Sequence, residues 1–129
     1  MTSELRVDNL KGSTTGGSIN VLGEGTSKTT NLQQGLCKCW CQFNGEGTIA
    51  IENSFNASSL TDVGTGDYTV HMTNSLSPDT GPYFANANIM HALDVSSDDA
   101  GVIRLGTYNT SHSATDTSRV YTGKFGDLA

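Results

Sequence analysis

Apolar and polar residues alternate in short runs from residue 36 to the end of the chain. Residues 36–43 (LCKCWCQF) alternate, NGEG at 44–47 is a turn signal, and TIAIENS at 48–54 alternates again. After a break near Asn53 and Ser54, similar runs separated by turn and loop residues follow at 55–63, 67–73, 83–95, 102–108 and 119–129. Alternation with a period of two gives a strand one buried and one exposed face. The pattern therefore predicts an all-β fold, an antiparallel β-sandwich of about six or seven strands.

Residues 1–35 have a different pattern. ELRVDNL and SINVLGEG are short alternating pieces, joined by segments rich in Gly and Thr, and they contain too few apolar residues to form a core. We expect residues 1–35 to be an extended N-terminal arm for assembly or attachment, and residues 36–129 to be the β-sandwich domain. The apolar residues of the arm that we expect to contact other subunits are Leu5, Val7, Leu10, Ile19 and Val21.

Composition and charge narrow the possible partners. Gly, Thr, Ser and Asn supply 56 of the 129 residues, a composition that suits short strands joined by tight turns. The formal net charge is −6 and the seven basic residues are scattered, which argues against a nucleic-acid partner, because binding phosphates requires clustered Lys and Arg. No apolar run approaches the roughly 18 residues of a spanning helix, so we expect no membrane span.

Motifs for catalysis or metal binding are absent from the sequence. There is no nucleophile elbow, zinc-protease helix, P-loop or EF-hand pattern, so we expect neither an enzyme nor a cofactor. Some Asp residues lie in or beside turns, where Asp hydrogen-bonds to backbone; calcium binding is the alternative. The three histidines lie in separate segments without ligand spacing, and we interpret them as ordinary surface or strand residues: His71, His91 and His112.

Residues 35–70 (GLCKCWCQFNGEGTIAIENSFNASSLTDVGTGDYTV) resemble a stretch found in tail-fibre-like proteins of tailed bacteriophages, especially marine ones. In that family an Asn-Gly-x-Gly turn follows a strand with Lys and Trp, and Ser-Phe-Asn and Thr-Gly-Asp-Tyr-Thr-Val strands come next. The opening LRVDNLKG and the ending FGDLA are also similar, whereas residues 71–120 match only in general style. The matching residues are Lys38, Trp40, Phe43, Asn44, Gly45, Gly47, Ser54, Phe55, Asn56, Ser58, Ser59, Gly64, Gly66, Asp67, Tyr68, Thr69 and Val70.

The resemblance implies a virion structural protein. Such domains lie on the outside of virions, commonly as trimers, and contact host surfaces. It therefore implies a homotrimer, virion partners reached through the N-terminal arm, and a host glycan or protein as a further partner. Fibres of this family are usually much longer, so a complete product of this length would be a small tip protein, a short spike or a capsid knob.

Two functional alternatives stay open beside host contact by a short tail fibre or spike. One is capsid decoration on the phage head. The other, from a different class, is a lectin-like carbohydrate-binding module or a fragment of a glycan-active enzyme, since β-sandwiches support both functions.

The three cysteines alternate along one expected strand, which places Cys37, Cys39, Cys41 and Phe43 on one face. Cα atoms two residues apart on a strand are about 6.5–7 Å apart, at or beyond the usual disulfide limit. A single strand also presents its thiols in a row and cannot surround a zinc ion, which needs about four convergent ligands. Small apolar residues stand at these positions in the phage family. We therefore expect core packing rather than a metal or redox role.

The other face of the same strand presents Trp40. A tryptophan there is either a subunit contact or a partly buried structural residue, and we take Trp40 as a candidate subunit contact. The core expected from the alternation consists of Cys37, Cys39, Cys41, Phe43, Tyr68, Val70 and Met72.

Overall fold

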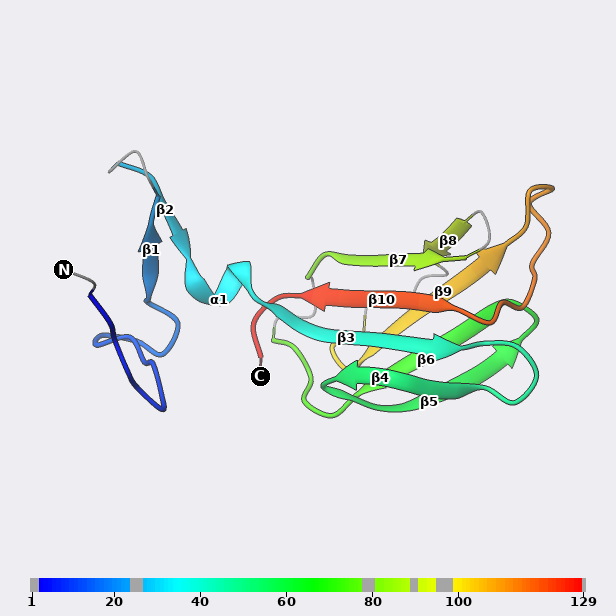
Figure 1. Cartoon of the computed structure of the whole chain (residues 1–129), viewed down its shortest axis with the longest axis horizontal. Helices are drawn as coiled ribbons and strands as arrows, with labels where there is room; N and C mark the ends of the chain where they lie inside the picture. The colour runs from blue at the N-terminus through cyan, green and yellow to red at the C-terminus, as the bar shows by residue number, and fades with distance from the viewer. Residues whose placement is uncertain (1–2, 24–26, 78–80, 89–90, 95–98, 129) are drawn as a thin grey trace. The chain divides into compact units, whose positions relative to one another are not determined.

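The computed structural model describes residues 3–23, 27–77, 81–88, 91–94 and 99–128 (Figure 1). Contacts within the chain divide it into two compact units, Met1–Leu36 and Cys37–Ala129. This division lies one residue beyond the boundary expected from the sequence. No described helix has the length or the apolar content of a membrane-spanning segment.

The N-terminal unit contains a short hairpin and one turn of helix. β1 (Asn20–Leu22) pairs antiparallel with β2 (Thr29–Asn31), and α1 (Leu32–Gly35) follows β2 directly. Asn31 caps the helix, because its side-chain oxygen accepts a hydrogen bond at 3.1 Å from the backbone N–H three residues later. Its amide also donates to the Gly17 carbonyl at 2.7 Å, which ties the preceding chain to the hairpin.

This unit differs from the extended arm expected from the sequence. Residues 4–10, expected as a short alternating piece, lie outside any strand, and the helical turn was not anticipated. No described residue between 3 and 36 is buried. A hairpin of three-residue strands is too short to enclose apolar side chains, so the described part of this unit has no core of its own.

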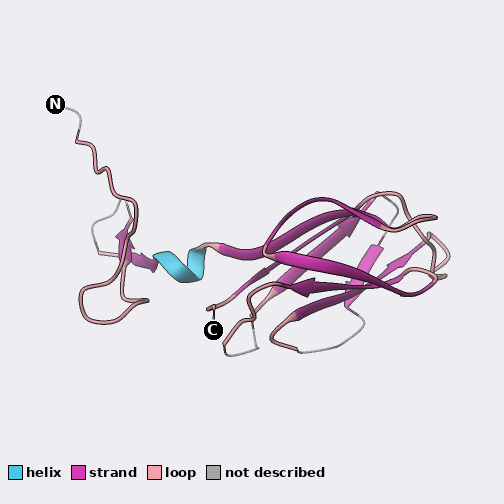
Figure 2. Cartoon of the chain, turned by 90° about the horizontal axis from the view of Figure 1, so that it is seen from below, coloured by secondary structure: helices cyan, strands magenta, loops and turns pink. Residues whose placement is uncertain are grey.

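The all-β sandwich predicted for the rest of the chain is confirmed. Two four-stranded antiparallel sheets form it (Figures 1 and 2). The first sheet has the order β4-β3-β10-β7, with strands β3 (Cys37–Asn44), β4 (Ala50–Phe55), β7 (Tyr83–Ala87) and β10 (Val120–Phe125). The second sheet has the order β5-β6-β9-β8, with strands β5 (Ala57–Gly64), β6 (Asp67–Met72), β8 (His91–Asp94) and β9 (Val102–Tyr108).

The first and last strands of the sandwich lie side by side. β3 and β10 occupy the centre of the first sheet, and β6 and β9 occupy the centre of the second (Figure 1). Cys41 is thus paired with Thr122, and Val70 with Ile103. Both central pairs join residues far apart in the sequence, so long loops must close before these strands can pair.

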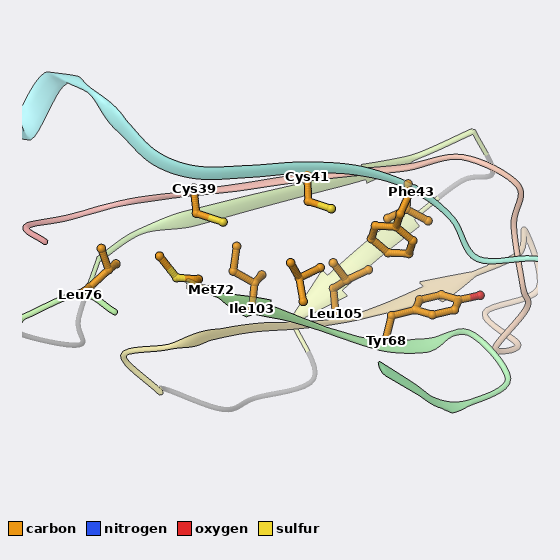
Figure 3. Packing of buried hydrophobic residues seen from close by; sticks show 10 residues of the cluster. Cys39, Cys41, Phe43, Tyr68, Met72, Leu76, Ile103 and Leu105 are labelled. Atoms are coloured by element: carbon orange, nitrogen blue, oxygen red, sulfur yellow. The ribbon is translucent and has the colours of Figure 1, made fainter. Parts of the chain in front are cut away.

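The core fills the space between the sheets (Figure 3). The ring of Phe43 on the first sheet meets Tyr68 on the second edge-to-face, with centroids 5.3 Å apart. Cys37, expected in the core, is only half-buried, because it lies at the start of β3 opposite an irregularity in the β10 pairing. The buried apolar residues are Cys39, Cys41, Phe43, Tyr68, Val70, Met72, Leu76, Ile103, Leu105 and Val120.

Asn56 is the single residue between β4 and β5, where the chain crosses from one sheet to the other. Its φ is 57°, in the left-handed region that Asn tolerates better than most residues. Its amide donates to the carbonyls of Lys38 and Asn74, both at 2.9 Å, and its oxygen accepts from the Asn74 N–H at 2.8 Å. The break expected near Asn53 and Ser54 therefore falls at Asn56 instead.

The run expected over residues 83–95 becomes two strands. β7 pairs with β10 in the first sheet, whereas β8 pairs with β9 in the second. The alternation continues through this change of sheet, so the sequence pattern predicts one strand where the structure has two. The described residues of the sandwich therefore form eight strands rather than six or seven. Ile89 and Met90, which fall within the expected run, lie outside the described residues.

Tyr68 joins three loops at one end of the sandwich. Its buried hydroxyl lies 2.7 Å from the Gly45 carbonyl and 3.0 Å from a carboxylate oxygen of Asp116. The same carboxylate oxygen accepts the Gly66 N–H at 2.6 Å. Gly66 has a φ of +66°, and an added Cβ would lie 2.5 Å from the Thr107 carbonyl oxygen, so a side chain does not fit there. These contacts hold the three loops together. Because Gly45 follows β3 and Asp116 precedes β10, they also connect the second sheet, which contains Tyr68, to the first.

Candidate binding face

Three exposed aromatic side chains lie in one row across the outer face of the first sheet. In the pairing register, Phe55 is opposite Trp40, Trp40 is opposite Gly123, and Gly123 is opposite Phe84. Cys39 and Cys41 point into the core, so Trp40 between them points outward. The exposed fractions of Phe55, Trp40 and Phe84 are 51%, 38% and 48%. We call these three residues the aromatic row.

Gly123 determines how one ring of the aromatic row lies. A Cβ added at Gly123 would be 2.6 Å from the ring of Phe84, so this ring rests on the strand where a side chain is missing. Phe84 also contacts the ring of Phe125, with centroids 6.2 Å apart and a tilt of 46°. The ring is therefore supported from beneath and from one side while keeping an exposed face.

A second row runs beside the first. Asn53 is opposite Gln42, Gln42 is opposite Tyr121, and Tyr121 is opposite Asn86. We call these four residues the amide row, since three of them carry side-chain amides. Gln42 donates to Glu52 at 2.6 Å, and the Asn86 oxygen accepts the backbone N–H of the next residue at 2.8 Å.

Two members of the amide row keep their polar groups available. The Asn53 amide makes no hydrogen bond to any described residue, and the same holds for the hydroxyl of Tyr121, whose side chain is 39% exposed. An amide supplies two donors and an acceptor, and a phenol supplies one donor and an acceptor. The face thus offers exposed ring surface next to uncommitted hydrogen-bonding groups.

The outer face of the second sheet has a different chemistry. Arg104 donates to both carboxylate oxygens of Asp67, at 3.0 and 2.6 Å, and Thr61 lies 2.9 Å from the His71 ring nitrogen. Four of its polar side chains are therefore paired with one another. Of the residues described on this sheet, Val63 is the exposed large apolar one.

Cys39 and Cys41 are buried in the core between the two sheets. Burial raises the pKa of the Cys41 thiol to about 12 and that of Cys39 to about 11, with the neighbouring thiols contributing. A thiol with a raised pKa is a poor nucleophile and a poor metal ligand. Cys37 donates to the carbonyl of Cys39 at 3.0 Å, so its thiol is occupied within its own strand.

The residues expected at subunit contacts lie in two places. Trp40 is on the outer face of the sandwich, whereas the other five belong to the N-terminal unit, where Ile19 is half-buried and the rest are exposed: Leu5, Val7, Leu10 and Val21. Their contacts with other chains remain predictions.

The polar residues singled out in the sequence do not converge. Among the described residues, no group of three or more His, Cys, Asp or Glu side chains could hold a metal ion. His71 contacts Thr61 on the second sheet, and His112 lies on the loop between β9 and β10. The side chain of His91 lies outside the described part.

Sequence reasoning missed most of the outer face. Phe55, Phe84 and Tyr121 were not selected, although alternation along a strand places Phe84 and Asn86 on the same side. The missing information was the pairing of four strands, which brings residues 40, 55, 84 and 123 into one row. No protein-family model matches the chain, and comparisons with curated proteins and with solved structures gave no significant match.

Proposed function

We propose that the protein is a structural component of a phage virion, a short tail-fibre-like or spike-like surface domain that assembles as a homotrimer and contacts the host. The resemblance over residues 35–70 motivates the virion location. The observation that best supports assembly is the exposure of apolar side chains in the N-terminal unit, because the described part of this unit has no core that could bury them.

Many residues shared with the phage family build the framework of the sandwich. Asn56 forms the crossing between the two sheets, and Tyr68 joins the loops at one end. Gly47 and Gly66 have φ values of +67° and +66°, as turn positions require. The resemblance therefore involves residues that determine the backbone path, which supports a related fold more directly than a shared ligand.

The N-terminal unit supports assembly. Leu5, Val7 and Leu10 are 76%, 55% and 56% exposed, and they recur within a short segment. Exposed apolar side chains grouped in this way mark surfaces that bind a partner. In a closed threefold assembly, the neighbouring copies would cover these apolar side chains in the same way on every chain. No apolar surface would then remain open for uncontrolled association.

Two measurements test this proposal. Light scattering of the purified chain at micromolar concentration should give about three times the 13.6 kDa chain mass. Antibodies raised against the sandwich should label the surface of intact phage particles in electron micrographs. A monomer in solution would contradict the trimer, and particles that stay unlabelled while disrupted particles react would contradict the surface location.

A further inference from the structure

We propose that the outer face of the first sheet binds a neutral saccharide, with the aromatic row stacking on sugar rings and the amide row hydrogen-bonding to their hydroxyl groups. This inference extends the proposed function, because it names the chemical class of the surface that the virion domain contacts. It gives Trp40 a role in ligand binding in place of the subunit contact expected from the sequence.

The aromatic row has the chemistry that sugar stacking requires. One face of a pyranose ring presents C–H groups with slight positive charge, and the face of an aromatic ring is negative. Trp40, Phe55 and Phe84 expose such rings on three strands of one sheet. Phe84 is already held by Gly123 and Phe125, so little rotamer freedom is lost when a ligand covers it.

The amide row supplies the polar half of the recognition. Sugar hydroxyls both donate and accept hydrogen bonds, as do a side-chain amide and a phenol. The Asn53 amide and the Tyr121 hydroxyl, which make no hydrogen bond to a described residue, lie two residues along their strands from the aromatic row, a distance of about 7 Å. A sugar ring stacked on Trp40 would thus reach polar partners at its edge.

The charge of the two rows favours a neutral ligand. No side chain in either row is charged at pH 7. The neighbouring Glu52 already accepts a hydrogen bond from Gln42. The chain as a whole carries a formal net charge of −6. Nucleic acids and acidic polysaccharides would be repelled by this charge and would meet no cation within the two rows.

The size of the two rows favours a short ligand over a second copy of the chain. The exposed fractions of Trp40, Phe55, Phe84 and Tyr121 add up to roughly 250–450 Å² of ring surface, taking about 150–250 Å² for a whole aromatic side chain. A stable protein–protein interface buries about 800 Å² on each partner. The exposed ring surface is therefore smaller than a stable subunit contact needs by itself, and it suits a short stretch of a sugar chain.

The chain contains one tryptophan, so its fluorescence reports on this face directly. The probes are free trisaccharides of glucose, mannose, galactose and N-acetylglucosamine, titrated into the full-length protein at millimolar concentrations. A printed array of neutral, sialylated and sulfated glycans widens the search. We expect at least one neutral sugar to change the Trp40 emission saturably.

Variants locate the binding to the two rows. Phe84→Ala keeps the fluorescent reporter, and we expect it to weaken binding about tenfold. Trp40→Ala, followed by calorimetry, should weaken binding at least as much, and Trp40→Phe should restore part of the loss. Asn53→Ala tests the amide row. Val63→Ala is the matched control, since it removes an exposed apolar side chain from the second sheet.

The outcomes separate this inference from the proposed function. A trimer that binds no neutral sugar overturns the saccharide site alone, whereas a monomer that binds sugar overturns the trimer alone. If Trp40→Ala converts a trimer into monomers and the wild-type protein binds no sugar, the face is an interface between copies. Binding only to sialylated or sulfated glycans would also contradict the inference, as would binding that Phe84→Ala and Trp40→Ala leave unchanged.

Discussion

The two units of the chain use their apolar residues in opposite ways. In the unit Cys37–Ala129, residues such as Phe43, Val70 and Leu105 are buried between two sheets. In the unit Met1–Leu36, Leu5 is 76% exposed and no described residue is buried. Both units contain strands, so strand formation alone does not produce a core.

The difference follows from sheet size. Two four-stranded sheets can face each other and remove side chains from water on their inner surfaces. A two-stranded hairpin has no second layer to pack against, and its apolar residues stay at the surface. Substitutions in the sandwich should therefore change stability, whereas substitutions in the N-terminal unit should change association.

The largest loss of stability is expected for Asn56→Ala. Alanine keeps the unfavourable φ and removes every side-chain hydrogen bond that joins Lys38 to Asn74, which leaves backbone groups without partners. We expect unfolding free energy to fall by about 3 kcal/mol, measured by urea denaturation. Asn56→Gly relieves the backbone strain and should lose less. A change below about 0.5 kcal/mol for Asn56→Ala would show that the crossing does not stabilise the sandwich.

Alkaline pH should destabilise the sandwich next most strongly. The thiols of Cys39 and Cys41 have pKa values of about 11 and 12 when folded, against 9 for an ordinary thiol. Above pH 9 the unfolded chain releases protons that the folded chain retains, so stability falls as pH rises. We expect a loss of about 2 kcal/mol between pH 8 and pH 10. Urea denaturation across this range measures it.

The double variant Cys39→Ala, Cys41→Ala is the control for the alkaline effect. It should be less stable at pH 8, because each substitution leaves a small cavity worth about 1 kcal/mol. Its dependence on pH between 8 and 10 should be much flatter than that of the wild-type protein. An equally steep dependence would assign the effect to other groups.

Tyr68→Phe is expected to have a smaller effect. The substitution keeps the ring against Phe43 and removes the hydroxyl near Gly45 and Asp116. We expect a loss of about 1–2 kcal/mol in unfolding free energy. The stability of the variant should also fall less steeply above pH 10, because it lacks the Tyr68 hydroxyl, whose pKa is about 12 in the folded protein. Unchanged stability would mean that the loops are held without this hydroxyl.

The smallest effect on stability is expected in the N-terminal unit. The triple variant Leu5→Ser, Val7→Ser, Leu10→Ser should change the unfolding free energy of the sandwich by less than about 0.5 kcal/mol, because none of these side chains belongs to the sandwich core. Light scattering should show a lower mass than for the wild-type protein. Val63→Ser is the control and should leave the mass unchanged. Loss of the β-sheet circular dichroism in the triple variant would show that the sandwich needs this unit in order to fold.

Local pattern was sufficient to predict most strands of the sandwich and most of the inward face of β3. The alternation in residues 36–43 placed Cys39, Cys41 and Phe43 on one side, and all three are buried. This works because a strand turns its side chains by a fixed half-turn at each residue, whatever its neighbours are. The turn at residues 44–47 was equally readable, since Gly47 occupies a backbone conformation that few other residues adopt.

Tertiary structure decided how the strands are arranged. Asn56 takes the chain from one sheet to the other through contacts with Lys38 and Asn74, neither of which is adjacent in sequence. The break between β7 and β8 also has no local signal, because the alternation continues across it. The row that brings Phe55, Trp40 and Phe84 together depends on β10 lying between β3 and β7. Pairing between distant strands is selected by the burial of the whole core, so no single stretch of the sequence contains it.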